Sequence, residues 1–318
     1  MTIIGQPTQP IPTMKNDLIH RVTRCSLALL LAALAILSTV GLKAGNFFTN
    51  TIDGITLNNN AGKSPASTSK SWAILALSGG VTITEPSSNT SFYDVIGDVG
   101  VAGAGNLSMT LSQIQGTAYL GTGTSTAGAS ITGGVLKTAG SNTYLNTAVS
   151  QATSANTTAS ALVNSTSGLT FSGLGSGVPS TISLNNTAGS ITGAAGGTYV
   201  MNLTNLILTG ANAVLNFSGS SLTNYIVNVS QYLTLSSAAK ITLSGGLTSA
   251  NVLFNVSANA SYNSYNVGLS GGSQLNGIIL APSRTVTLTG ASKVTGEVIG
   301  KTVSLSGSSQ VVATNVSP

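Results

Sequence analysis

Few side chains in this sequence are suited to acid–base chemistry. Of 318 residues, 11 are Lys or Arg and 6 are Asp or Glu. Asp94 and Asp98 are the only close pair of carboxylates, and the Gly97-Asp98 step favours a turn in which they accept local backbone hydrogen bonds. We expect Glu297, at a strand start, to make a surface or corner contact, and Arg284, after Pro-Ser, to be a solvated loop cation. These patterns predict no catalytic centre.

The only His and the only Cys, His20 and Cys25, lie in a leader that we assign to residues 1–44. A basic stretch, an apolar run over 27–37 and small residues near Ala44 are typical of a secretory signal, and Met14 is an alternative start of translation. A retained N-terminal anchor is the alternative. Once the leader is cleaved, no imidazole or thiol remains for a catalytic triad, a zinc site or a disulfide. We therefore expect no enzyme, cofactor or metal, and a secreted or cell-surface location.

The chain after the leader is almost neutral, with 7 Lys and Arg against 5 Asp and Glu. Soluble domains usually carry about 25% charged residues. Without a basic stripe to neutralise phosphates, nucleic acid is not an expected partner. Hydroxyl and amide side chains provide the polarity instead, which suits a β protein.

One nine-residue pattern recurs: apolar-x-apolar-x-small-small-x-x-apolar. Its copies begin at Val99, Leu206, Leu233, Val267, Val286 and Val303. A short repeat with one alternating strand in each unit predicts a solenoid, because a single unit cannot bury its apolar side chains alone. Gly or Ser at the fifth position allows the chain to turn a corner.

We therefore predict an all-β fold, a right-handed parallel β-helix with one α-helix packed alongside. A β-sandwich is the alternative. The helix is expected at 143–165, where Gly is absent and Leu145, Val149, Ala152, Ala159, Leu162 and Val163 share a helical stripe. The predicted organisation is an irregular segment at 45–70, a single β-helix domain at 71–313 and a short tail at 314–318.

Several motifs resemble known families of secreted β-solenoids. Asp94-Val-Ile-Gly-Asp98-Val-Gly100 and Gly296-Glu-Val-Ile-Gly300 are similar to the choice-of-anchor A family of bacterial surface proteins. The opening Trp72-Ala-Ile-Leu-Ala-Leu-Ser-Gly-Gly, with Gly97-Asp-Val-Gly100, also resembles the bacterial and fungal ice-binding β-helix family. The first resemblance implies an adhesive domain, and the second a β-helix with a helix packed along it.

The candidate binding residues are Thr285, Thr287, Thr289 and Thr234. An ice-binding face is expected to repeat Thr at coil spacing, because its methyl is apolar, its hydroxyl fits ordered water and its branched Cβ holds one rotamer. The outward middle positions of the six copies are Gly100, Ile207, Thr234, Gly268, Thr287 and Ser304. We expect no ladder there, no continuation of the Thr cluster on neighbouring strands, and weak or no thermal hysteresis.

Two further groups of residues have ordinary explanations. Asn-x-Ser/Thr occurs at Asn202, Asn216, Asn228 and Asn255, which we attribute to composition. Tyr225, Tyr232, Tyr262 and Tyr265 are expected to pack in the core or at corners, although they could form a stacking platform for sugar.

These observations favour an exported, monomeric, non-enzymatic β-solenoid with an adhesive or structural binding role. Its expected partner is an extracellular-matrix, cell-surface or polysaccharide ligand, and no membrane span is expected after signal cleavage. The alternatives are an ice-binding protein and a polysaccharide-active β-helix.

Overall fold

Apolar residues alternate with polar ones along most of the chain, and in the computed structural model these stretches are β-strands. The structure describes residues 51–52, 55–56, 72–86, 93–137, 143–259 and 261–313, all within one unit that spans 44–318. The predicted leader and tail, and most of the irregular segment, lie outside the described residues.

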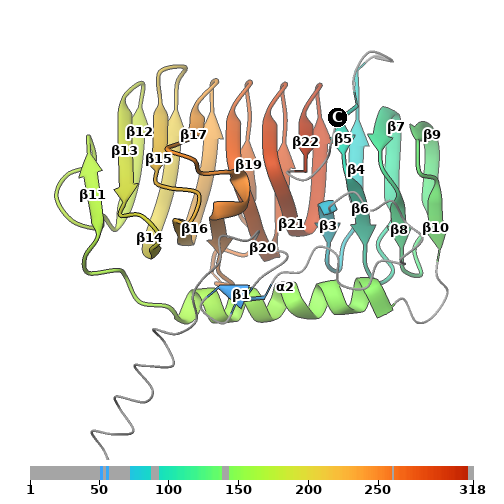
Figure 1. The fold of residues 1–318 in the computed structure, drawn as a ribbon. Helices are drawn as coiled ribbons and strands as arrows, with labels where there is room; N and C mark the ends of the chain where they lie inside the picture. The colour runs from blue at the N-terminus through green and yellow to red at the C-terminus, as the bar shows by residue number, and fades with distance from the viewer. Residues whose placement is uncertain are drawn as a thin grey trace, which may run out of the picture. The chain divides into compact units, whose positions relative to one another are not determined.

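The elements follow one another as strands, one helix and then strands again (Figure 1). The first part of the chain contains β1 (Thr51–Ile52), β2 (Ile55–Thr56), β3 (Trp72–Ala76), β4 (Val81–Thr84), β5 (Val95–Ile96), β6 (Asp98–Val101), β7 (Leu107–Gln115), β8 (Ala118–Leu120), β9 (Ser125–Ile131) and β10 (Val135–Lys137). After α2 (Thr143–Ala161) come β11 (Leu169–Ser172), β12 (Thr181–Asn185), β13 (Ala188–Gly193), β14 (Thr198–Thr209), β15 (Val214–Ser218), β16 (Asn224–Ser236) and β17 (Lys240–Ser244). The chain ends with the 3-10 helix η1 (Ser249–Asn251), β18 (Val252–Val256), β19 (Val267–Leu269), β20 (Gln274–Leu288), β21 (Lys293–Ser306) and β22 (Gln310–Val312).

All strands from β3 onward join one sheet that winds into coils, and every pairing in it is parallel except that of β11 with β13. Long strands turn corners, so that β20 and β21 each contribute to three faces. The helix face comprises the first halves of β14 and β16, β18, the middles of β20 and β21, β3, β6, β8 and β10. The hydroxyl face comprises β12, the second halves of β14 and β16, β19, the ends of β20 and β21, β4, and the starts of β7 and β9. The third face contains β13, β15, β17, β22 and β5.

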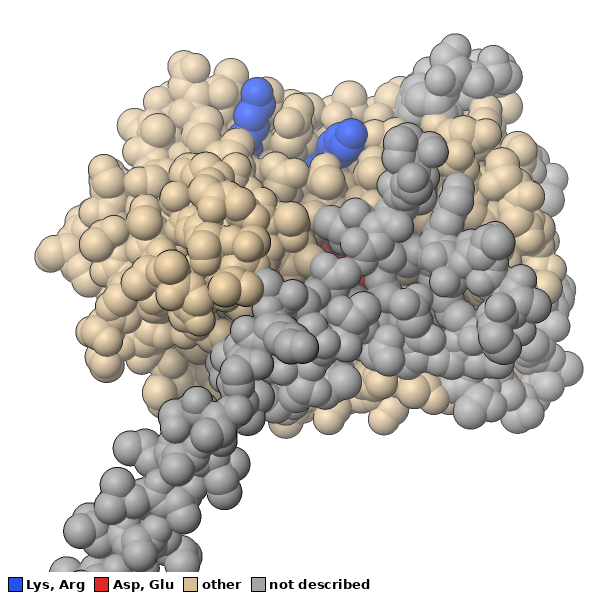
Figure 2. All heavy atoms as spheres, viewed as in Figure 1, with Lys and Arg blue, Asp and Glu red and all other residues tan. Residues whose placement is uncertain are grey.

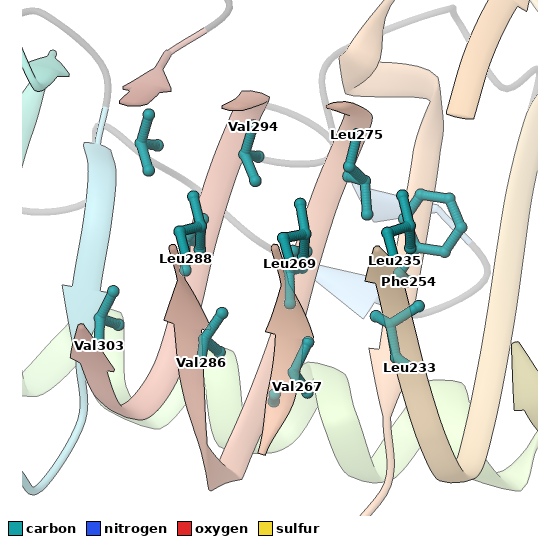
Figure 3. Close-up of a cluster of buried hydrophobic side chains, with 14 of the residues drawn as sticks. Leu233, Leu235, Phe254, Val267, Leu269, Leu275, Val286, Leu288, Val294 and Val303 are labelled. Atoms are coloured by element: carbon teal, nitrogen blue, oxygen red, sulfur yellow. The ribbon is translucent and has the colours of Figure 1, made fainter. Parts of the chain in front are cut away.

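The core lies inside the coils, where equivalent apolar side chains stack on one another (Figure 3). Val267 pairs with Val286, and Val286 with Val303, so the closely spaced copies of the repeat stack as predicted. Leu288, between two outward threonines, has no exposed surface. Stacking therefore buries the apolar side chains that a single coil would leave exposed, as expected for a solenoid.

The coils do not follow one another in the order of the sequence. The last strands, β21 and β22, pair with β3, β4 and β5 near the start of the chain. We call this junction the seam. The backbone N–H of Val311 donates to the carbonyl of Asp94 at 2.9 Å, and that of Ala313 to Ile96 at 2.8 Å. The C-terminal strand β22 thus lies within the stack and not at its end (Figure 1).

Helix α2 runs along the stack and covers the helix face (Figure 1). Leu145, Ala148, Ala152, Ala155 and Ala159 turn toward the sheet and are at most 5% exposed. Their small side chains let the helix approach the strands closely. The helix ends at Ala161, four residues before the predicted end, and the prediction is wrong for Val163, which is 80% exposed.

The chain leaves the helix early because its backbone finds partners on β14. The Ser165 N–H donates to the Val200 carbonyl at 2.9 Å, and the Asn164 side-chain oxygen accepts from the Asn202 N–H at 2.6 Å. These bonds replace the helical bonds that residues 162–165 would otherwise make.

An asparagine ladder fixes the second half of α2 to the sheet. The Asn255 side-chain amide donates to the Asn228 side-chain oxygen at 2.7 Å, and Asn228 donates to Asn202 at 2.8 Å. Asn228 also donates to the Ala159 carbonyl at 2.7 Å, and the Asn156 amide donates to the Asn255 side-chain oxygen at 2.6 Å. Three of the Asn-x-Ser/Thr sites that we had attributed to composition therefore hold the helix in place.

Corners between faces follow the repeat. Gly271, Gly290 and Gly307, at its fifth position, have φ between 62° and 64°, and Ser237 has φ 57°. Glycine adopts this left-handed conformation without a steric penalty, which confirms the predicted role of the fifth position.

One copy of the repeat was assigned wrongly. Val99 pairs with Ile74 and Ala118 on the helix face, whereas the other copies start on the hydroxyl face. Gly100 is consequently buried, and a Cβ on it would meet Leu75, Trp72 and Leu145. Alternation identifies a strand but does not say which side of a coil the strand forms.

Candidate surface-binding face

The candidate threonines lie on the hydroxyl face but do not form one cluster. Thr285, Thr287 and Thr289 flank the buried residues of β20 and are partly exposed. Thr234, on β16, belongs to the same row as Thr287, but Gly268 of β19 stands between them. The structure thus groups Thr285 and Thr287 of β20 with Thr289, which directly follows it, and separates Thr234 from Thr287 by one intervening strand.

A longer row of hydroxyls continues from Thr287 across the seam. Thr287 pairs with Ser304, Ser304 with Thr82, and Thr82 with Ser108. The expectation that neighbouring strands do not continue the cluster is wrong for this row. Four consecutive coils present a hydroxyl at the same outward position.

A second row runs beside the first. Ser306 pairs with Thr84, and Thr84 with Thr110, while the pairing of Leu288 with Leu305 puts Thr289 beside Ser306. Together the two rows form what we call the hydroxyl patch, defined by Thr287, Thr289, Ser304, Ser306, Thr82, Thr84, Ser108 and Thr110.

The candidate residues included only Thr287 and Thr289 of these eight. Thr82, Thr84, Ser108 and Thr110 were missed because the seam brings together strands that are far apart in the chain. The local signal was nevertheless present, since Val81-Thr-Ile-Thr84 has the alternation of Val286-Thr-Leu-Thr289. On the other side of Thr287 the face is irregular, because Gly268 and Ile207 occupy the middle row.

No residue of the hydroxyl patch carries a charge. In the view of Figure 2, isolated basic side chains interrupt a described surface that is otherwise almost uncharged. Lys240 and Lys293 lie on the third face, where both are in register with Gln274. The patch is therefore suited to recognition by hydrogen bonds and methyl contacts, not by ion pairs.

Two buried acids, Asp94 and Glu85, lie at the seam. The Asp94 carboxylate accepts from the Gln113 N–H at 2.6 Å, and Glu85 accepts from the Ser308 N–H at 2.6 Å. Burial, and then the neighbouring Glu85 carboxylate, raise the pKa of Asp94 to about 6. The two carboxyl groups are at most 3% exposed and hold backbone segments together.

Three sequence interpretations of charged residues need correction. The side chains of Asp94 and Asp98 reach beyond a local turn: each accepts a backbone N–H from a residue 19 positions away, and for Asp98 this is Thr117 at 2.9 Å. Glu297 is 1% exposed on the helix face and not at the surface. The adjacent coil provides the bonds of both aspartates, since β5 pairs with β7 and β6 with β8, and the expectation of a local turn did not take this coil spacing into account.

Arg284 is not a solvated cation but is 1% exposed. Its guanidinium donates to the carbonyl oxygens of Gln231, Ser230 and Ser257 at a corner of the coil. Burial lowers the pKa of this group.

The four tyrosines separate into two environments. Tyr225 is fully buried in the core, in contact with Phe217. Tyr232, Tyr262 and Tyr265 form a tyrosine cluster at the surface, with ring centroids 5.0–5.8 Å apart. The prediction of core packing is correct for Tyr225, whereas Tyr265 is 46% exposed.

The described residues contain neither a membrane-spanning helix nor a cluster of metal ligands. In the ranges that the structure describes, no helix has the length and apolar character needed to span a membrane. Within the same ranges, no three His, Cys, Asp or Glu side chains gather in a way that could hold a metal ion.

Comparison with known structures supports the architecture. A glycosylated ice-binding protein from an Arctic yeast is 23% identical, with a TM-score of 0.51 over 78% of this chain and 92% of that one. Ice-binding proteins from the Antarctic ascomycete Antarctomyces psychrotrophicus (19% identity, TM-score 0.47) and from Shewanella frigidimarina (17%, 0.45) each cover 77% of this chain and 95% of their own. The similarity to the Arctic yeast protein establishes the β-helix fold alone.

Sequence comparison identifies the family. None of the curated proteins matches the chain. A family model described as "Putative Ice-binding-like adhesive domain" matches residues 45–311, which includes every described strand up to the last residue but one of β22. The chain therefore belongs to the ice-binding-like adhesive domain family.

Proposed function

We propose that this chain is an exported, non-enzymatic adhesive module that binds an extended surface through the hydroxyl patch. The observation that carries the proposal is the pair of hydroxyl rows over four consecutive coils. The family to which the chain belongs is described as adhesive and ice-binding-like, and its solved relatives are described by what they bind and not by a reaction.

The geometry of a parallel sheet makes the patch a regular array. Neighbouring strands lie about 4.7–4.9 Å apart, and alternate residues on one strand about 6.6 Å apart. Hydroxyls at these two spacings present donors and acceptors in a fixed grid, so little conformational entropy is lost when a partner binds. An ordered surface, such as a polysaccharide fibre or a cell wall, can meet many of them at once.

A buried core below the patch keeps this grid rigid. Val286, Leu288, Val303 and Leu305 alternate with the patch residues and have no exposed surface. A rigid, uncharged face also explains how a chain with few titratable groups could act outside the cell as a monomer, without chemistry of its own.

Ice is the second candidate, favoured by one specific observation. Thr287, Thr289, Thr82 and Thr84 form two Thr-x-Thr pairs that face the same way, two coils apart, with serines between them. Threonine presents a methyl and a hydroxyl in one rotamer, which is what an ordered water layer requires. The solved relatives named above are described as ice-binding.

One pair of variants tests the face. Thr287→Tyr puts a ring in the middle of the grid, whereas Thr192→Tyr puts the same ring on an exposed position of the third face. The purified proteins are compared for retention on collagen, on insoluble cellulose, on whole bacterial cells and on slowly grown ice. We expect Thr287→Tyr to lower retention at least tenfold and Thr192→Tyr to leave it unchanged.

The outcomes separate the candidates. Retention on ice alone, with thermal hysteresis that Thr287→Tyr abolishes, would favour the second candidate. Equal retention of the two variants would exclude the hydroxyl patch as the binding face, and no retention on any surface would exclude adhesion.

A further inference from the structure

The tyrosine cluster lies at an edge of the hydroxyl face. Tyr232 directly precedes the buried Leu233 of β16, and the register places Thr285 of β20 in the same row, two coils away. Tyr262 and Tyr265 come from the connection between β18 and β19. The cluster therefore stands next to the outward side chains of this face but uses none of the hydroxyl patch.

The connection that carries two of the tyrosines is held in one shape by its own hydrogen bonds. The Tyr262 N–H donates to the Asn259 carbonyl at 2.8 Å, and the Tyr265 N–H to the Tyr262 carbonyl at 3.0 Å. The Asn263 side chain accepts from the Asn259 N–H at 3.0 Å, and the Asn259 side chain from the Ser261 N–H at 3.1 Å. The rings are therefore presented by ordered turns.

Arg284 joins the two backbones from which the tyrosines project. Its donors bond to Ser230 and Gln231, directly before Tyr232, and to Ser257, where the connection begins. Both terminal nitrogens of the guanidinium donate to these carbonyls, and Arg284 is only 1% exposed. Arg284 therefore positions the cluster and does not present its charge to a ligand.

The rings contact one another mainly through their edges. Tyr232 meets Tyr262 at 79° and Tyr265 at 68° between ring planes. With 46% of Tyr265 exposed and the other two rings half-buried, ring surface remains accessible. The face of an aromatic ring is electron-rich and attracts polarised C–H groups, and the phenol hydroxyls add hydrogen bonds beside it.

We propose that the tyrosine cluster is a binding subsite for a neutral pyranose unit of a polysaccharide. Such a sugar has an apolar C–H face that stacks on Tyr265 and equatorial hydroxyls for the neighbouring amides and phenols. The residues around the rings, Asn259, Ser261, Asn263, Ser264 and Asn266, are polar without charge, which fits a neutral ligand. The inference deepens the adhesive function proposed above by naming a ligand class, but its residues are separate from the hydroxyl patch.

Calorimetric titration with soluble hexasaccharides tests the subsite. Cellohexaose, maltohexaose and chitohexaose serve as neutral probes, and hexagalacturonate as an acidic one. We expect at least one neutral probe to bind, Tyr265→Ser to weaken it at least tenfold, and Tyr265→Phe to keep most of the affinity because the ring remains. Leu222→Ser removes a side chain of similar exposure (47%) elsewhere and should leave binding unchanged.

Thermal unfolding of each variant separates a binding role from packing. A Tyr265→Ser protein that unfolds near the wild-type temperature but no longer binds supports the subsite. Wild-type protein that binds none of the neutral probes, or binds only hexagalacturonate, overturns the proposal, as does Tyr265→Ser protein with undiminished affinity. Loss of hexasaccharide binding in Tyr265→Ser reports on this subsite, and loss of surface retention in Thr287→Tyr reports on the hydroxyl patch, so failure of the two proposals is distinguishable.

Discussion

The carboxyl groups of Glu85 and Asp94 are buried side by side at the seam. Among the described residues, Glu85 Oε1 and Asp94 Oδ1 are buried and have no hydrogen-bond donor, whereas the other oxygen of each accepts a backbone N–H. Two charged carboxylates side by side in such a site would repel, so a proton on one of them is favoured.

Stability should consequently fall as pH rises through the pKa of Asp94. That pKa is raised to about 6 in the folded protein from an ordinary 3.8, so the contribution is complete below about pH 4 and is lost on passing pH 6. We expect a loss on the order of 1–2 kcal/mol of unfolding free energy between pH 4 and 7, allowing for solvent screening. Urea unfolding at four pH values measures it.

Asp94→Asn is the matching variant, since an amide keeps the bond from Gln113 and can donate to Glu85. Its unfolding free energy should vary much less over this range and should equal or exceed that of the wild type at pH 7. Asp98→Asn, at another buried acid, should retain the wild-type slope. A wild-type protein equally stable at pH 4 and pH 7 would contradict the shared proton.

At the scale of elements, the asparagine ladder attaches the second half of α2 to the sheet. Asn228 occupies its middle, with donors to Ala159 and Asn202 and an acceptor for Asn255. Asn228→Ala would remove one hydrogen bond from each of these three partners inside or at the edge of the helix contact, at a cost of about 2–4 kcal/mol.

Asn216→Ala is the control, because Asn216 bonds only to Thr242 and Ser244 on the exposed third face. It should cost about 1 kcal/mol or less. Urea unfolding gives the free energies, and amide exchange in α2 should accelerate for Asn228→Ala alone. Equal protection of the helix in both variants would show that apolar packing suffices to hold it.

For the whole molecule, the seam predicts that residues of β21 and β4, which are far apart in the chain, lie side by side. Ser304 and Thr82 are register partners on adjacent parallel strands, at about 4.8 Å between Cα atoms, which is within the range that a disulfide spans. A Ser304→Cys/Thr82→Cys protein carrying Cys25→Ser should therefore form a disulfide on mild oxidation. A shift in mobility on a non-reducing gel detects it.

Thr234→Cys with Ser304→Cys is the control, because these residues share a row but are separated by two further strands. No intramolecular disulfide should form in it. If the control oxidised as readily as the seam pair, or if the seam pair stayed reduced, the stacking order of the coils would be wrong.

The sequence predicted the local units better than their arrangement. The repeats that begin at Val267, Val286 and Val303 were recognisable because consecutive coils are also consecutive in the chain. The copy at Val99 was placed on the wrong face, since a two-residue period is the same on every side of a coil. The burial of Arg284 depended on carbonyl groups 27 to 54 residues away, which the local sequence around it does not indicate.

In the candidate site, too, single strands could be predicted from the sequence but not which strands lie next to each other. Thr287 could be chosen from its own strand, but its neighbour Thr82 could not, because only the seam makes them part of one array. The asparagines illustrate the opposite case. Asn202, Asn228 and Asn255 recur at nearly constant spacing in the sequence, so a ladder could have been predicted had the spacing been compared with the coil length.

The order of the coils also governs when the chain can fold as it is made. Strands β3 and β4 are made long before β21. One hydrogen-bonding edge of each pairs with β6 or β7, and the other edge stays unpaired until β21 is available. An intermediate in which β21 has not yet emerged therefore lacks the junction in the middle of the stack. The parts of the stack on the two sides of this junction can join only after β21 has been made.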